Sequence, residues 1–279
     1  MAEILRVPFV DSSMPELSVQ YGESIGIYGE SATGKSEFIR GIFRLKKGVK
    51  YREMARLTAT ERALFQTEIA YFDGELETRT KDTVADFVSP LAAKIFVGTS
   101  EIVDVLQIPR ADLNESVAKV GEYTRAKLAL LQALAKGAKL LIIDDVFGLR
   151  PAFKKGLVAL LKKVGKEMDT AYLAASTDLG FLVALTSRIA VVDGGALVEL
   201  NASKAIATAP VHPYTRWLVN SHNMKKEIGT TFIRTEKDAR VKKGCRFAHF
   251  CPVSSEVCVE KTPPATEKGT GIYLCHNAK

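Results

Sequence analysis

Short apolar runs alternate with longer helix-like stretches over most of the chain. Five of the runs have the length and character of buried strands: residues 24–28, 69–72, 139–145, 170–175 and 188–192. Helical patterns occupy four stretches: residues 35–45, 81–136, 156–166 and 216–221. Strands that alternate with helices predict an α/β domain with a mostly parallel sheet.

Two of the apolar runs end at residues able to bind a ligand. Residues 139–145 finish with Asp144 and Asp145, and residues 24–28 lead directly into a loop that contains glycine. Open α/β sheets bind ligands at the carboxyl ends of their strands. These two positions are therefore the first candidates for a functional site.

The loop has the pattern Gly-x-x-x-x-Gly-Lys-Ser of a phosphate-binding P-loop. Its members are Gly29, Glu30, Ser31, Ala32, Thr33, Gly34, Lys35 and Ser36. In such a loop the backbone N–H groups point at phosphates, and the helix that follows adds the positive end of its dipole. We expect Lys35 to pair with the β- and γ-phosphates of ATP, Ser36 to ligate Mg²⁺, and Asp144 to hold the metal through its water shell.

Length and composition allow one sizeable domain and a smaller appendage, since the chain has 279 residues, of which 47% are hydrophobic. The periodic pattern weakens after residue 203. We predict a nucleotide-binding domain over residues 1–203, with a reduced helical subdomain near residues 75–136, and an extension over residues 204–279. No leader pattern is present and no run reaches the roughly 20 apolar residues of a membrane span, so a cytoplasmic location is expected.

The net charge of +7 comes largely from the last third of the chain. The basic residues gathered there are Lys225, Lys226, Arg234, Lys237, Arg240, Lys242, Lys243 and Arg246. Such a surface can meet an acidic protein, anionic lipid or nucleic acid. No aromatic interleaving or nucleic-acid motif accompanies the charges, so a solvated basic surface is favoured and no direct nucleic-acid binding is expected.

All four cysteines fall in the last 35 residues, at Cys245, Cys251, Cys258 and Cys275. Their clustering indicates one shared role, which in a reducing compartment is metal ligation more often than disulfide formation. Four thiolates suit Zn²⁺ or an iron–sulfur cluster. Free buried thiols are the remaining interpretation, and His212 is expected to have a structural role.

Further segments carry a family resemblance. In the first part of the chain they are residues 21–24, 29–31, 140–145, 178–180 and 187–191; in the extension they are residues 212–215, 244–247 and 251–252. With these segments the chain resembles the ATPases of ATP-binding cassette (ABC) transporters, in the branch that imports dipeptides and oligopeptides. The resemblance implies an ABC-type P-loop fold. It also implies a [4Fe-4S] cluster on the four cysteines, with Zn²⁺ as the alternative.

The residues that serve hydrolysis in this family are changed. The glutamate that polarises the attacking water is replaced by Asp145, and the switch histidine by Thr177. The LSGGQ segment corresponds to residues 120–124, where Glu122 and Tyr123 replace glycines. A small displacement of a catalytic group lowers a rate strongly. These changes together predict a subunit that binds ATP and hydrolyses it weakly or not at all.

Two other family positions are also altered. The glutamine expected after residues 69–72 is replaced by Asp73 and Gly74, and Gln66 lies before the strand instead of after it. Phe9 is the candidate for the aromatic side chain that stacks on adenine.

The resemblance implies several partners. We expect a second ABC ATPase subunit, which forms a heterodimer with this chain, and two membrane permeases that hold the pair at the inner face of the cell membrane. A second hypothesis is a soluble ABC-type subunit that regulates or assembles a non-membrane enzyme complex. An independent ATPase is disfavoured by Asp145 and Thr177.

Overall fold

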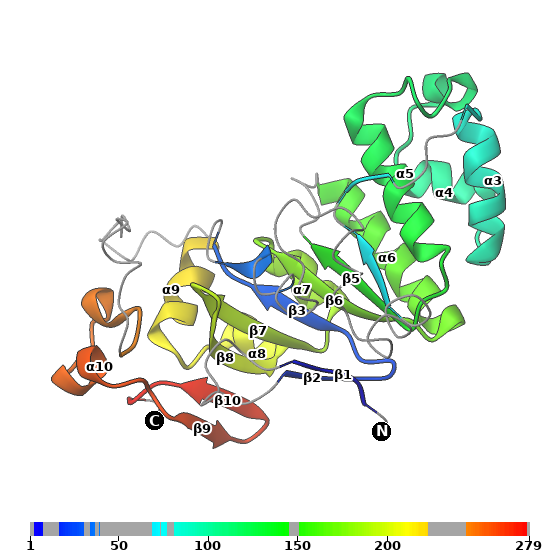
Figure 1. The fold of residues 1–279 in the computed structure, drawn as a ribbon. Coiled ribbons are helices and arrows are strands. Elements are labelled where there is room, and N and C mark those ends of the chain that lie inside the picture. The colour runs from blue at the N-terminus through cyan, green and yellow to red at the C-terminus, as the bar shows by residue number, and fades with distance from the viewer. Residues whose placement is uncertain are drawn as a thin grey trace, which may run out of the picture. The chain divides into compact units, whose positions relative to one another are not determined.

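Two compact units make up the chain (Figure 1). The computed structural model describes residues 3–7, 17–30, 34–36, 39, 69–72, 74–76, 81–144, 151–222 and 244–277. The first unit comprises Met1–Ile4, Gln20–Ser24 and Val49–Ala174, and the second comprises Leu5–Val19, Ile25–Gly48 and Ala175–Lys279.

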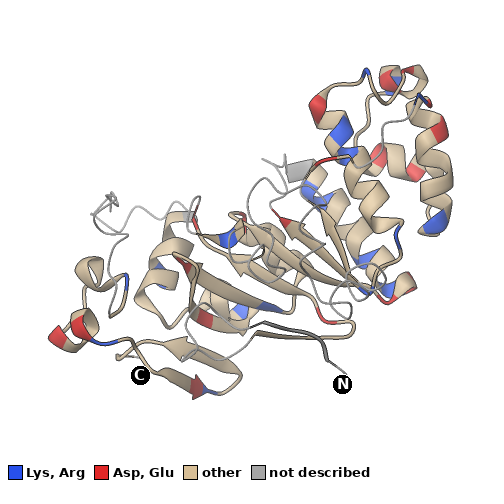
Figure 2. Cartoon of the chain, viewed as in Figure 1, with Lys and Arg blue, Asp and Glu red and all other residues tan. Residues whose placement is uncertain are grey.

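Five helices of the described residues lie in the first unit. Its helices are α3 (Val84–Lys94), α4 (Thr99–Val105), η2 (Arg110–Asn114), α5 (Glu122–Leu134) and α6 (Pro151–Met168). Thr83 caps α3, because its hydroxyl accepts a hydrogen bond from the Asp86 N–H at 3.2 Å. Figure 2 shows charges of both signs on α3, α4 and α5, as on a solvated surface.

The strands β4 (Ile69–Phe72), β5 (Leu140–Asp144) and β6 (Ala171–Ser176) follow one another in the sheet; β4, β5 and the first four residues of β6 belong to the first unit. β4 and β5 are parallel, with Ile69 opposite Leu140. Every residue of β5 and β6 is buried, which explains why both read as continuous apolar runs without alternation.

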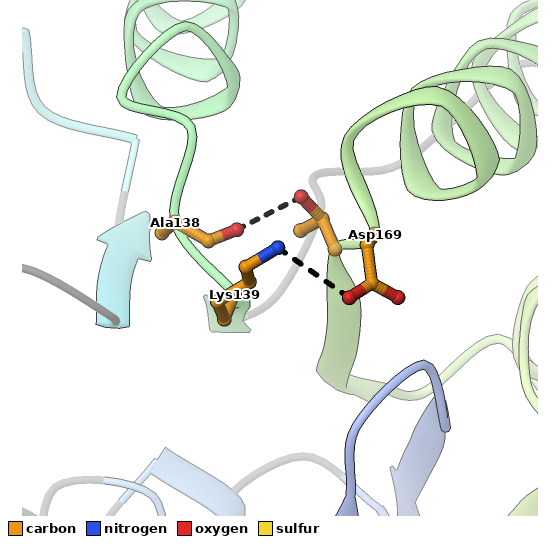
Figure 3. Close-up of polar contacts among 4 residues, drawn as sticks. Ala138, Lys139 and Asp169 are labelled. Carbon is orange, nitrogen blue, oxygen red and sulfur yellow. Dashed lines mark hydrogen bonds and ion pairs between the residues drawn. The ribbon is translucent and has the colours of Figure 1, made fainter.

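Two contacts hold together the chain segments that enter β5 and β6 (Figure 3). The Thr170 hydroxyl donates to the Ala138 carbonyl at 2.8 Å, and Lys139 Nζ lies 3.4 Å from Asp169 Oδ2. The hydrogen bond is buried, whereas the ion pair is largely exposed and therefore contributes little to stability.

The second unit is built on a mixed run of strands. Their order in space is β3 (Ile25–Tyr28), β7 (Arg188–Asp193), β8 (Ala196–Ala202), β10 (Gly271–Leu274) and β9 (Ala265–Lys268). β3 and β7 are parallel, whereas β8, β10 and β9 each pair antiparallel with the preceding strand in that order. A separate two-stranded sheet is formed by β1 (Glu3–Val7) and β2 (Leu17–Gln20).

Short helices complete the second unit. They are α7 (Leu179–Leu185), α8 (Ser203–Thr208), α9 (Pro213–His222), η4 (Ala248–Phe250) and α10 (Glu256–Glu260). Asp178 caps α7, since its Oδ1 accepts from the Phe181 N–H at 2.8 Å. No helix in the described part of the chain combines the length and apolar character needed to cross a membrane.

The predicted α/β fold class is confirmed, although the sheet is mixed because tight turns link β7 to β8 and β9 to β10. A two-residue turn reverses the chain and forces antiparallel pairing, while parallel neighbours need a longer crossover. The extension contributes β9 and β10 to this sheet, and β10 pairs with β8.

Candidate functional site

The predicted phosphate loop begins at the end of β3, whose four residues are all buried. Lys35 is only 6% exposed, and its Nζ donates to the carbonyls of Gly29 at 3.1 Å and Glu30 at 2.5 Å. Gly34 has φ +85°, in the left-handed region that favours glycine. The lysine side chain therefore folds back over the start of its own loop.

The surroundings of Lys35 suit an anion. A charged ammonium group hydrogen-bonded to neutral carbonyls gains more from a phosphate oxygen, because hydrogen bonds between charged groups are stronger. Ser36 follows in the same helical turn and is half-buried. Ser31, Ala32 and Thr33 lie outside the described residues.

Asp144 ends β5 and is 6% exposed. The hydroxyl of Tyr71, on β4, donates to Asp144 Oδ2 at 2.9 Å. This tyrosine did not emerge from the sequence, because 73 residues separate it from its partner. It fixes the orientation of the carboxylate that we expect to hold magnesium. Asp145 lies outside the described residues.

We expect Tyr71→Phe to raise the Mg²⁺ concentration needed for half-maximal ATP binding about 10-fold, since a hydrogen bond to a charged group contributes about 1.5–3 kcal/mol. Titrating Mg²⁺ at fixed ATP, with nucleotide binding in excess chelator as the baseline, measures the change. Tyr172→Phe is the matched control, because Tyr172 also loses a buried hydrogen bond, to the Leu161 carbonyl at 2.7 Å. An identical Mg²⁺ dependence in Tyr71→Phe and wild type would contradict this role.

Residues 120–124 form the entry to α5. Gly121 is the N-cap residue and makes no side-chain capping hydrogen bond, and Glu122 opens the helix. Tyr123 is 49% exposed, with Lys127 Nζ 4.2 Å from its ring centroid. Thr124 is buried, and its hydroxyl donates to Asp112 Oδ2 at 2.8 Å. A carboxylate at this helix start opposes phosphate, which a bare helix N-terminus would attract.

Thr177 is exposed and lies between β6 and the helix cap Asp178. Its hydroxyl cannot take up a second proton as an imidazole does near neutral pH. Gly74 follows β4 with φ +87°. Asp73, Gln66 and Phe9 lie outside the described residues, as do the eight basic residues named in the sequence analysis, except Arg246.

The four cysteines lie close enough together for their thiols to interact. Burial raises the pKa of Cys245 to about 11, and the thiols of Cys275, Cys251 and Cys258 add to the rise. The Cys245 N–H donates to the Cys258 carbonyl at 2.7 Å, and the Asn277 N–H lies 3.4 Å from Cys275 Sγ. Shared electrostatics and backbone bonds therefore gather these side chains at one place.

A fully buried carboxylate supports the same region. Glu199, on β8, has 0% exposure, and its two oxygens accept from the N–H groups of Val211 at 3.0 Å and His212 at 2.9 Å. Burial raises the pKa of Glu199, while these two N–H donors lower it. The sequence gives no signal for this role, since the partners lie 12 and 13 residues further on.

His212 has the structural role that was expected. It is 2% exposed, its Nδ1 accepts from the Tyr214 N–H at 3.0 Å, and burial lowers its pKa to about 4. The neutral ring therefore carries its hydrogen on Nε2, which lies 3.9 Å from Cys245 Sγ. His249 is exposed, and His276 Nε2 contacts the Lys261 carbonyl at 3.0 Å.

Among the described residues, no three His, Cys, Asp or Glu side chains are placed to hold a single metal ion. An iron–sulfur cluster contains several irons and sulfides, so its ligands stand further apart than those of one ion. The described residues therefore show no metal site at the four cysteines, and their role as ligands of a [4Fe-4S] cluster or Zn²⁺ stays a prediction from the sequence.

Two family models match this chain. Residues 13–148 match the ABC transporter model, and residues 198–258 match the model of the oligopeptide/dipeptide transporter C-terminal region. The chain carries an ABC transporter ATPase domain followed by a peptide-transporter C-terminal region.

Relatives of this chain are named as oligopeptide transport ATP-binding proteins. The chain is 24% identical over 289 residues to the oligopeptide transport ATP-binding protein AppF of Bacillus subtilis, and the alignment covers 93% of this chain and 87% of that one. It is 24% identical over 223 residues to the oligopeptide transport ATP-binding protein OppF of Lactococcus lactis, covering 74% of this chain and 70% of that one.

Solved structures support the ABC fold. CbiO1 from Clostridium perfringens, part of an ABC transporter complex, aligns with a TM-score of 0.52 at 16% identity, covering 80% of this chain and 95% of that one. The ATP-binding cassette MJ0796, in a dimeric state after hydrolysis, aligns with a TM-score of 0.50 at 16% identity, covering 72% of this chain and 96% of that one.

The structure of this ABC protein brings together some of the predicted site residues. Gly29, Glu30 and Lys35 are joined by hydrogen bonds, and the four thiols interact with one another. Asp144 belongs to the first compact unit, whereas the P-loop belongs to the second. Its role as the magnesium carboxylate stays a prediction from the family motif.

Proposed function

We propose that this chain is the ATP-binding subunit of a peptide-type ABC importer. Lys35 and Ser36 would hold the phosphates and Mg²⁺ of ATP, and Asp144 would hold the metal's water shell. A second ATPase subunit would complete a heterodimer on the cytoplasmic face of two membrane permeases. In this role the region from about residue 204 is a separate functional extension, as its match to a peptide-transporter C-terminal region from residue 198 supports.

One combination of observations carries this proposal. The chain has a P-loop with a buried lysine directed at its own backbone carbonyls, and it also has the C-terminal region found in oligopeptide and dipeptide transporters. The first feature suits nucleotide binding in general, while the second narrows the family to peptide import. Relatives named as oligopeptide transport proteins align over both parts.

Isolation of the native complex tests the assignment. The tagged chain is purified from detergent-solubilised membranes of its own cells, and every co-purifying protein is identified by mass spectrometry. We expect two multispan permeases and a second ABC ATPase. A complex made only of soluble enzymes would overturn the transport role and favour a regulatory or assembly subunit.

We further propose that the P-loop of this chain retains ATP and does not turn it over efficiently. Thr177 cannot act as a protonatable switch, and Asp145 is one methylene shorter than glutamate. Glu122 and Tyr123 place a carboxylate and an exposed ring at the start of α5, where a partner's γ-phosphate would approach. In a heterodimer, the ATP site on this chain's P-loop would thus be weakened by Asp145 and Thr177. The site on the partner's P-loop would be weakened by Glu122 and Tyr123 of this chain.

We expect the purified chain to hydrolyse ATP at least 100-fold more slowly than the roughly 10 s⁻¹ typical of enzymes. Restoring the glutamate alone, with Asp145→Glu, should give little gain, because catalytic groups act together and the other changes remain. Phosphate release assays on the chain alone, and on the complex with its partner, measure both rates. Turnover near 10 s⁻¹ by the chain alone would refute the degenerate site.

For the cysteines we propose a [4Fe-4S] cluster held by Cys245, Cys251, Cys258 and Cys275. The electrostatic interaction among the four thiols supports it. Bound there, the cluster would cross-link the extension, whose own core is small.

Protein purified without oxygen should be brown and contain about four irons and four sulfides per chain, as a cluster with four cysteine ligands requires. Cys258→Ser, which removes a buried ligand, should lower the iron content sharply. Ser255→Ala is the control, because it removes a neighbouring hydroxyl and spares every thiol. Stoichiometric zinc without iron or sulfide would establish the alternative metal.

A further inference from the structure

The turn between β7 and β8 lies between the P-loop and the cysteine-bearing extension. β3 and β7 are parallel, with Tyr28 opposite Val191. Because the carboxyl ends of parallel strands lie at the same end of a sheet, the P-loop after β3 and the turn Gly194-Gly195 after β7 leave the sheet there together. All of these residues belong to the second unit.

On one side the turn touches the P-loop. A Cβ atom added to Gly34 would lie 2.8 Å from the Gly195 nitrogen and 3.3 Å from the Gly194 carbonyl carbon. Real Cβ atoms essentially never come as close as the 2.8 Å to the Gly195 nitrogen, so glycine at position 34 is what lets the two backbones approach this closely. The position of the turn thus sets the position of the P-loop glycine.

On its other side the turn carries an arginine from the extension. A Cβ atom on Gly194 would collide with Arg246 Nη1 and lie 2.8 Å from Cζ and 3.2 Å from Nε. Three atoms of the planar guanidinium group therefore cover the Gly194 backbone. Arg246 follows Cys245, which is anchored to Cys258 by a backbone hydrogen bond of 2.7 Å.

We propose that Arg246 is a positioning residue of the nucleotide site, supplied by the cysteine-bearing extension. Its guanidinium group holds the Gly194-Gly195 turn against Gly34, and its positive charge beside the P-loop favours an anionic triphosphate. The inference rests on ATP binding as proposed above. It makes the extension a support of the nucleotide site, in addition to any metal it binds.

Four variants of the full chain test the proposal, with the ATP dissociation constant measured by calorimetry. Arg246→Ala should weaken ATP binding about 5- to 10-fold, and Gly194→Ala should do the same, because its Cβ displaces the guanidinium group. Gly195→Ala is the matched control. It shares the positive φ (+77° against +57°), but its Cβ would meet no atom within 4 Å. Arg246→Lys should recover part of the affinity through its charge.

Salt and the double variant separate positioning from general damage. The affinity ratio between wild type and Arg246→Ala should shrink as salt rises, since added ions screen the charge. In a chain that already carries Arg246→Ala, adding Gly194→Ala should weaken ATP binding no more than adding Gly195→Ala does. The contact between Gly194 and Arg246 is already lost in that chain. Equal losses in Gly194→Ala and Gly195→Ala, or unchanged affinity in Arg246→Ala, would overturn the proposal. A wild-type chain that binds no ATP would refute the proposed function itself.

Discussion

Replacing Lys35 with alanine should raise the ATP dissociation constant at least about 30-fold, because removing one partner of a buried, hydrogen-bonded charge pair costs about 2–5 kcal/mol. Lys35 is 6% exposed, and its ammonium group is held at the start of the loop by the carbonyls of Gly29 and Glu30. Calorimetric titration with ATP and Mg²⁺ measures the change.

Lys127→Ala is the matched control for this experiment. Lys127 is equally buried, at 6% exposure, and its Nζ also donates to a backbone carbonyl, that of Gln107 at 2.7 Å. Its loss should lower stability and leave the ATP dissociation constant of the isolated chain unchanged. A folded Lys35→Ala protein that binds ATP as wild type does would show that the loop is not the nucleotide site.

Glu199→Ala should lower the free energy of unfolding by about 3–5 kcal/mol. The substitution leaves the N–H groups of Val211 and His212 buried without their acceptor, and each orphaned donor costs about 1–3 kcal/mol. It also releases the turn that places His212 beside Cys245. Denaturant unfolding, with the midpoint and slope fitted separately, measures the effect.

Two further variants define the origin of that loss. Glu199→Gln keeps one carbonyl acceptor and should cost less than Glu199→Ala. Glu267→Ala removes an exposed glutamate from β9 and should change stability by no more than about 0.5 kcal/mol. A Glu199→Ala protein within about 1 kcal/mol of wild type would mean that water replaces the carboxylate at both N–H groups.

The sequence predicted elements well where the pattern was local and continuous. β3, β4 and β5 lie within one residue of the predicted runs, since buried parallel strands are apolar at every position. α6 begins at Pro151, five residues before the prediction, because proline at a first helical position marks a start instead of a break. α7 was missed, as its seven residues have no polar face from which a helical period could be detected.

The candidate site shows the same limit. The P-loop is contiguous, so its lysine and glycines could be assigned from spacing alone. Tyr71 and Arg246 could not, because each meets its partner through the fold, across dozens of intervening residues. Glu199 lies between Val198 and Leu200 in a strand, where a charged residue normally faces solvent, and only the later segment around His212 buries it.

Because β10 pairs with β8, the extension also protects the sheet from pairing with strands of other molecules. Without residues 244–277, the outer edge of β8 would present a row of unsatisfied N–H and C=O groups, and such open edges recruit strands from other molecules. With the extension present, the outermost strand on this side of the sheet is β9. It has four residues, all of them exposed, and they include Glu267 and Lys268. A short, charged edge of this kind discourages intermolecular pairing. Chains truncated before the extension should accordingly be recovered as aggregates, even where the P-loop itself is untouched.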